Sequence, residues 1–334
     1  MNEFRVYKTI HFSNELAKQI TAMHHKYWNT TKGTYMYYNV VEMNNDPKHN
    51  FYILGLLDDK VIASCFVDTY RDYENDQIIN NYDEYIISSL MIDKDYQKQG
   101  YGTKLLEATI EILKEENAIK ICAFACNNSE KLFEKLGFTK DESIKSFGSI
   151  VPGDDTDVYY ELNLESNFFL APLNETDVLF IADSMHNKLW EYVDENSNLP
   201  LNLLPTVSMY KQEILKNATY DNALVKLVRC NKMVAGYTYT YYHDYDIPNK
   251  ESHHYVSVSF YLKDDYLYQS AVKAIVDEAI QFFKLNQKNH NIQYIKVVLN
   301  KWTIIMKNYN FYRRCLLKLG FKQIDNELFT LYVE

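Results

Sequence analysis

Glycine, proline and cysteine are all scarce in this chain of 334 residues, which contains nine, six and five of them. So little glycine and proline excludes collagen-like and low-complexity disordered chains. The cysteines are odd in number, no two form a C-x-x-C pair, and no histidine lies close to Cys122 and Cys126 in the sequence. The pattern therefore predicts reduced, mostly buried thiols, with neither a disulfide framework nor a metal site.

Long apolar runs and an excess of positive charge are also missing. No apolar run approaches the roughly 20 residues that span a bilayer, and residues 1–5 lack the basic and apolar regions of a signal peptide. We therefore expect a cytoplasmic protein without a membrane partner. The formal net charge of −10 argues against a nucleic-acid partner, because phosphate binding needs a basic face. A composition of 47% hydrophobic and 24% charged residues is typical of a globular protein.

Because glycine is scarce, two glycines one residue apart mark a local requirement. They lie between an apolar segment, residues 86–92, and an amphipathic segment, residues 105–113. A strand, a glycine turn and a helix start together form an anion site, since free N–H groups and the helix dipole both favour phosphate. A tight strand-to-helix turn would use the same glycines. The residues of this stretch, called the phosphate loop below, are Gln97, Lys98, Gln99, Gly100, Tyr101, Gly102 and Thr103.

The two halves of the chain repeat one order of elements. Each half contains two apolar runs around a short polar turn, at residues 51–67 and 223–237, which is typical of a β-hairpin. A long helical pattern, a strand and a shorter helix follow in both halves. A boundary near residue 165 therefore separates two predicted domains, residues 1–165 and 166–334. Strands alternating with helices predict an α/β fold with helices on both faces of each sheet.

Both shorter helices end in the same phrase, Leu-Gly-Phe, at residues 136–138 and 319–321. Gly137 and Gly320 are well placed to end a helix in the left-handed conformation, and the phenylalanine that follows can pack back on the helix.

The first half resembles the GNAT superfamily of N-acetyltransferases, through the Q-x-x-G-x-G pattern after a strand and the helix ending in Leu-Gly-Phe. The second half resembles the family only through its hairpin and its own Leu-Gly-Phe. The resemblance implies two tandem GNAT-like domains, the second degenerate. Each would be a mostly antiparallel sheet with one splayed parallel pair of strands.

The resemblance also implies acetyl-CoA as co-substrate, with its pyrophosphate on the N–H groups of the phosphate loop. The pantetheine arm would pair with Leu90, Met91 and Ile92 in the gap between the splayed strands. Three further residues would meet CoA. Asn127 would bind the pantetheine arm or cap a helix, Lys131 would reach a phosphate or be a surface lysine, and Phe133 stands where many relatives carry a proton-donating tyrosine.

Glu84 is the candidate general base, since it begins the strand that should bear the thioester; a solvated loop residue is the alternative. Residues 27–38 fall where the family binds its acceptor. A small primary amine is the expected acceptor and a peptide N-terminus the second candidate, while a non-catalytic CoA-binding or interaction protein is the rival from another class. In the second half, Asp264 and Asp265 stand where phosphate would dock, so we expect no CoA there. A monomer and a homodimer both stay open.

Overall fold

A computed structural model describes residues 3–10, 13–28, 50–74, 77–125, 129–145, 158–195, 205–245, 253–299 and 308–333. The chain divides into two compact units, Met1–Ser166 and Asn167–Glu334, and each is described here by itself. Within the described residues no helix is long and apolar enough to cross a membrane.

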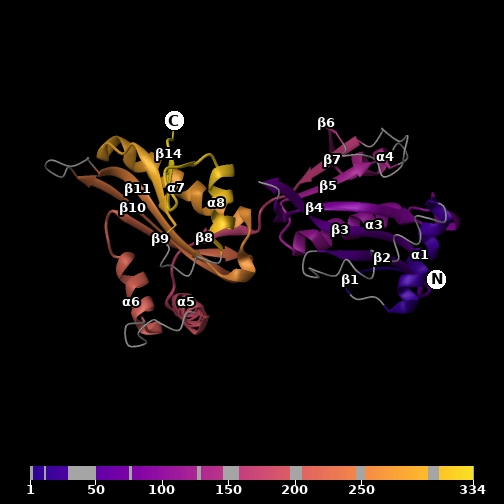
Figure 1. The fold of residues 1–334 in the computed structure, drawn as a ribbon, viewed down its shortest axis with the longest axis horizontal. Coiled ribbons are helices and arrows are strands. Elements are labelled where there is room, and N and C mark those ends of the chain that lie inside the picture. Colours follow the sequence, from indigo (N-terminus) through magenta and orange to yellow (C-terminus); the bar gives the residue numbers. More distant parts are fainter. Residues whose placement is uncertain are drawn as a thin grey trace. The chain divides into compact units, whose positions relative to one another are not determined.

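The first unit is a seven-stranded mixed sheet in the order β1-β2-β3-β4-β5-β7-β6 (Figure 1). Among the described strands of this unit, only β4 and β5 are parallel neighbours. The elements are β1 Phe4–Thr9, α1 Asn14–Trp28, β2 Phe51–Leu57, β3 Lys60–Glu74, β4 Gln77–Ile92, the 3-10 turn η1 Lys94–Tyr96, α3 Tyr101–Glu115, β5 Lys120–Ala125, α4 Glu130–Lys135, β6 Thr139–Lys145 and β7 Val158–Asn163.

The second unit has the same topology, with strand order β8-β9-β10-β11-β12-β14-β13 when read from its other edge. Its parallel pair is β11–β12. The elements are β8 Phe168–Ala171, α5 Glu175–Glu195, α6 Val207–Asn217, β9 Ala223–Cys230, β10 Met233–Tyr245, β11 His253–Leu262, η3 Asp264–Tyr266, α7 Gln269–His290, β12 Tyr294–Val298, α8 Tyr309–Lys318, β13 Lys322–Gln323 and β14 Leu328–Leu331. Two mixed sheets with one parallel pair each confirm the predicted α/β fold.

The predicted hairpins form at the predicted places. In the first unit β2 and β3 pair antiparallel around Asp58 and Asp59, which both have positive φ. Two such residues in succession match the twist of a tight hairpin, and aspartate tolerates this conformation. In the second unit β9 and β10 pair in the same way, with Asn231 at positive φ.

The Leu-Gly-Phe phrases also end their helices as predicted. Gly137 has φ +87° and Gly320 has φ +88°. At the C-terminal end of α4, the N–H of Phe138 donates to the carbonyl of Phe133, and the N–H of Gly137 donates to the carbonyl of Glu134. The end of α8 has the same two bonds. This is the Schellman arrangement, which satisfies carbonyl groups that the helix end would leave open.

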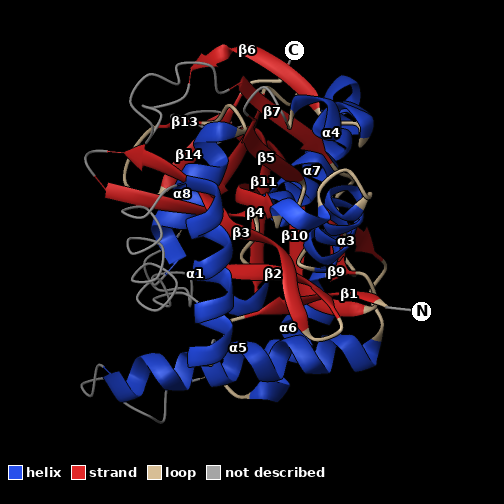
Figure 2. Ribbon diagram, turned by 90° about the vertical axis from the view of Figure 1, so that its right-hand side faces the viewer, coloured by secondary structure: helices blue, strands red, loops and turns tan. Residues whose placement is uncertain are grey.

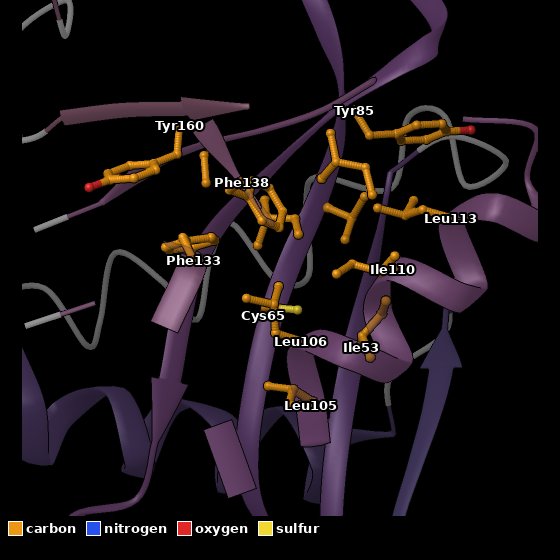
Figure 3. Close-up of a cluster of buried hydrophobic side chains, with 14 of the residues drawn as sticks. Ile53, Cys65, Tyr85, Leu105, Leu106, Ile110, Leu113, Phe133, Phe138 and Tyr160 are labelled. Carbon is orange, nitrogen blue, oxygen red and sulfur yellow. The ribbon is translucent and has the colours of Figure 1, made fainter. Parts of the chain in front are cut away.

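Two separate cores cover the two faces of the first sheet. On one face α3 packs Leu105, Leu106 and Leu113 against strand residues such as Ile53, and Figure 3 shows these side chains together. On the other face α1, which crosses the sheet in Figure 2, packs its own apolar side chains against β2 and β3. These are called the α3 face and the α1 face below. Each buried leucine contributes about 1.5–3 kcal/mol, so both layers are held firmly.

Candidate functional site

The phosphate loop ends at an uncapped helix start. Gly100 is the N-cap residue of α3, with φ +85°, and no side chain of the described residues caps it. The first N–H groups of a helix have no partner inside it, and the helix dipole adds partial positive charge there. A Cβ built on Gly100 meets nothing within 4 Å, so the space beside this N-cap residue is open. The start of α3 can therefore receive an anion.

Two side chains of the phosphate loop bond to backbone carbonyls just before it. Gln97 donates its side-chain N–H to the carbonyl of Ile92 at 3.0 Å, and Gln99 donates to the carbonyl of Asp95 at 3.2 Å. Lys98 has φ +60°, an uncommon conformation outside glycine. Gly102 differs from Gly100, because its Cβ would make only ordinary contacts, 3.6 Å from side-chain atoms of Ile92 and Leu132.

Strands β4 and β5 pair over only four residues and then separate. The register runs from Glu84–Lys120 to Ile87–Ala123. Beyond this point β4 continues to Ile92 while pairing only with β3, and the two strands diverge in Figure 1. The end of this parallel pair is the gap that the GNAT resemblance places beside the phosphate loop.

A β-bulge lies at the gap, and sequence reasoning missed it. Ser88 pairs with Phe66 and Met91 with Ser64, so Ser89 and Leu90 together face one residue of β3. Ser89 has φ +51°. A bulge leaves backbone groups unpaired and redirects the strand. Nothing in the pair Ser88-Ser89 signals this, since serine has no strong preference for positive φ.

Backbone alternation decides which predicted strand residues face the gap. The N–H of Asp93 bonds the carbonyl of Ile62 on β3 at 2.8 Å. Because main-chain groups of successive strand residues point to opposite sides, the groups of Ile92 and Leu90 face away from β3 and towards the gap. Those of Met91 face β3. Part of the edge at Ile92 is already used, since its carbonyl accepts from Gln97.

Glu84 begins the parallel pair and lies on the α1 face. Its carboxylate is 2.9 Å from the ammonium of Lys120, and the residue is 8% exposed. Burial alone would lower the pKa of Lys120, but the hydrogen bond and charge of Glu84 outweigh it and the pKa is raised. Glu84 precedes Ser88 by four positions, which is about 13 Å along a strand. A base at Glu84 would therefore need a chain of waters, or an acceptor long enough to span this distance, to act at the gap.

Further polar side chains of β5 and β7 lie on the same face as Glu84. The thiol of Cys122 lies 2.9 Å from the hydroxyl of Tyr159, which also reaches Glu161 at 3.5 Å. Burial raises the pKa of Cys122 to about 11, so the thiol stays protonated at neutral pH and is a poor nucleophile.

The remaining predicted residues fall in three places. Lys131 is exposed on α4, in keeping with both of its interpretations. Phe133 is 2% exposed and its ring packs on Phe138 and Tyr160, so its observed contacts are those of the core (Figure 3). Asn127 lies outside the described residues, as does the predicted acceptor segment beyond residue 28. Among the described residues no group of three or more His, Cys, Asp or Glu could hold a metal ion.

The second unit preserves the strand pairing but not the site. Its four-residue parallel register begins at Tyr255–Tyr294, where the first unit has Glu84–Lys120. The pairing of β10 with β11 runs without a shift, so β11 has no bulge against that neighbour. Only two residues separate η3 from α7, and none of them is glycine.

The aspartates of η3 lie before the counterpart of the phosphate loop, and not where phosphate was expected to dock. The N–H groups of Lys263 and Tyr266 make the same bonds as those of Asp93 and Tyr96, so Asp264 and Asp265 occupy the places of Lys94 and Asp95 in η1. Asp264 forms an ion pair with Lys188 of α5 and accepts a hydrogen bond from Asn308 at 3.1 Å.

Part of this chain is similar to known proteins. Residues 17–138 match the family model "Acetyltransferase (GNAT) family". No curated protein matches. A GNAT family N-acetyltransferase (YhbS) from Escherichia coli, solved in complex with CoA, is 14% identical, with TM-score 0.37, over 49% of this chain and 83% of that one.

Two further solved structures are similar over about half of this chain. The ribosomal-protein-S18-alanine N-acetyltransferase from Escherichia coli is 18% identical, with TM-score 0.35, over 49% of this chain and 95% of that one. An aminoglycoside 6'-N-acetyltransferase complexed with coenzyme A is 12% identical, with TM-score 0.37, over 48% and 96%. On the family match, which includes the phosphate loop, Glu84 and the Leu-Gly-Phe helix, residues 17–138 belong to the GNAT family of acetyltransferases.

Proposed function

We propose that the first unit transfers the acetyl group of acetyl-CoA to a primary amine of a small molecule. The observation that carries this proposal is the open start of α3 beside the gap between β4 and β5. N–H groups at Gly100 and in the first turn of α3 would hold the pyrophosphate, as helix N-termini hold anions generally. Main-chain groups of Leu90 and Ile92 would hold the pantetheine arm along the open edge of β4.

The proposed chemistry needs few side chains. Glu84 would accept a proton from the acceptor ammonium through a chain of waters, because it lies about 13 Å along the strand from Ser88, and so free the nitrogen lone pair. The nitrogen then bonds to the thioester carbon, the carbon–sulfur bond breaks, and the thiolate leaves and takes up a proton. An unpaired N–H of the bulge would hold the negative charge that develops on the carbonyl oxygen. Holding both substrates in one site supplies much of the remaining acceleration.

Charge on the α1 face supports a cationic acceptor. Directly paired strand residues share a face, and side chains alternate along each strand. The registers therefore place four carboxylates on this face together with Lys120. The four are Asp68 on β3, Glu84 on β4, Asp141 on β6 and Glu161 on β7. On the described strands these carboxylates outnumber Lys120, so this face carries an excess of negative charge and attracts cations. This favours small cationic amines over neutral acceptors and over the N-termini of acidic peptides.

A panel of amines with a thiol-release readout tests the proposal. Polyamines and aminoglycosides are expected to release CoA thiol faster than monoamines at equal concentration, because a second ammonium can bind a second carboxylate. Raising salt should reduce this preference. Peptides reacting faster than all small amines would favour the second candidate acceptor. If no amine in the panel causes release of CoA thiol, the non-catalytic protein is favoured.

Calorimetry is expected to find one acetyl-CoA site per chain, in the first unit. In the second unit the described pairing of β10 with β11 has no bulge, and no glycine stands between η3 and α7. The check is a titration of the full chain with acetyl-CoA and with CoA. Two equivalent sites would show that the second unit binds as well, and no binding at all would contradict the proposed function.

A further inference from the structure

We propose that Lys26 is a positioning residue, which holds the 3-10 turn η1 in place from α1 and so sets the direction of the phosphate-loop N–H groups. This proposal rests on the proposed function, because it concerns the affinity for acetyl-CoA. Lys26, Asp93 and Asp95 are called the latch below.

Asp93 is the fixed point of the latch. It is 5% exposed and precedes η1 as its N-cap residue. Its N–H donates to Ile62 at 2.8 Å, its carbonyl accepts from Tyr96 at 2.8 Å, and its carboxylate accepts from the N–H of Asp95 at 3.2 Å. A buried carboxylate is costly unless its charge is paired. The partner is Lys26, whose ammonium lies 3.4 Å from the other carboxylate oxygen.

Lys26 reaches Asp93 from the last turn of α1. Its ammonium also lies 3.6 Å from the carboxylate of Asp95. The helix itself is anchored, since Ile20 and Met23 are buried against the sheet and Gln19 accepts the N–H of Val61 at 3.0 Å. The latch thus connects a rigid helix to the turn that precedes Gln97.

The connection continues from the latch to Gly100. Gln99 bonds the carbonyl of Asp95, and Gln97 bonds that of Ile92, so both braces of the phosphate loop end on residues beside Asp93. A shift of η1 would move Gln99 and the N–H groups after it. Hydrogen bonds to an anion weaken steeply with misalignment, so a small displacement would lower the affinity for pyrophosphate.

The second unit repeats the arrangement of a lysine on the first helix and an aspartate in the 3-10 turn. There Lys188 of α5 pairs with Asp264 of η3. The main chain around the two turns matches as well, since the N–H groups of Lys263 and Tyr266 make the same bonds as those of Asp93 and Tyr96. A bridge from the first helix to the 3-10 turn thus occurs in both units, although Lys263 stands where the first unit has Asp93. Between the described turn and helix of each unit, a glycine follows the turn only in the first unit.

The latch can be removed without opening a closed cavity in the core. The side chain of Lys26 is 51% exposed and lines an open cavity of about 320 Å³ together with Met23 and Asp93. The other charged groups around this cavity are Asp58, Asp59 and Lys60. Methionine at position 26 would keep the packing of the lysine stem and delete only the charge.

Lys26→Met is expected to weaken acetyl-CoA binding about three- to fivefold, the range of a partly exposed ion pair. Lys26→Arg should restore most of the affinity. Lys18 is an exposed lysine on the same helix. Lys18→Met is therefore the matched control and should bind acetyl-CoA as the wild type does. Calorimetry measures the Kd of the three variants for acetyl-CoA, and thermal melting checks that each variant is folded.

A comparison of two acetyl donors separates positioning from a general structural effect. Acetyl-pantetheine has no pyrophosphate, so Lys26→Met should raise KM for acetyl-CoA and leave KM for acetyl-pantetheine unchanged. Equal increases for both donors, or an unchanged Kd for acetyl-CoA, would overturn the proposal. A wild-type chain that binds no acetyl-CoA would instead overturn the proposed function.

Discussion

Gly100→Trp is expected to abolish acetyl-CoA binding and leave the first unit folded. The indole would occupy the space beside the N-cap residue of α3, which nothing fills within 4 Å of a Cβ at this position. Losing two charge-assisted bonds of about 1.5 kcal/mol each raises Kd by about 100-fold or more. Calorimetry with acetyl-CoA measures the loss, and a melting curve measures folding.

Two other glycines serve as controls for this variant. Gly100→Ala and Gly137→Ala force a side chain into nearly the same backbone conformation, φ +85° and +87°, and each should cost about 1 kcal/mol of stability. Only the change at Gly100 should weaken binding, because a Cβ at Gly137 would contact Leu162 of β7 and no residue of the loop. Gly102→Ala should fold and bind well, since its Cβ makes ordinary contacts. Unchanged binding by Gly100→Trp would place the pyrophosphate elsewhere.

Local signals in the sequence predicted the hairpins and the helix ends well. Asp58 and Asp59 tolerate positive φ, and Gly137 needs no Cβ, so each favours its turn regardless of what surrounds it. The fold follows from repeating these signals in one order along both halves. The predicted strand before the phosphate loop was too short, because the polar residues at the start of β4 hide its pairing with β3.

Features that depend on partners distant in sequence could not be predicted in the same way. Ser89 takes positive φ because two residues of β4 face one of β3. Lys26 and Asp93 meet although 67 positions separate them. Phe133 stands at the position of a family tyrosine, and only the packing of α4 shows that its ring belongs to the core. The row of carboxylates on the α1 face comes from four strands and exists only once their registers are known.

Glu84→Gln is expected to lower kcat by about 100-fold, because glutamine is isosteric but cannot accept the proton of the acceptor. KM for acetyl-CoA should change little. Glu84 lies on the α1 face at the start of the parallel pair, whereas the gap lies at the end of that pair. The residual rate should rise with pH more steeply than that of the wild type. At high pH more of the acceptor arrives as the neutral amine, and the need for a base disappears. Steady-state kinetics from neutral to alkaline pH measures both effects.

Glu116→Gln is the matched control for this variant. Glu116 also pairs with a lysine, Lys8 at 2.5 Å, and both members of that pair are partly buried. It stands at the C-terminal end of α3, while the phosphate loop stands at the other end. Any loss of stability from breaking a Glu–Lys pair should therefore appear in both variants, whereas the fall in kcat and its pH dependence should appear only with Glu84→Gln. Equal kcat values in the two variants would show that the carboxylate of Glu84 holds Lys120 in the sheet and that the proton leaves by another route.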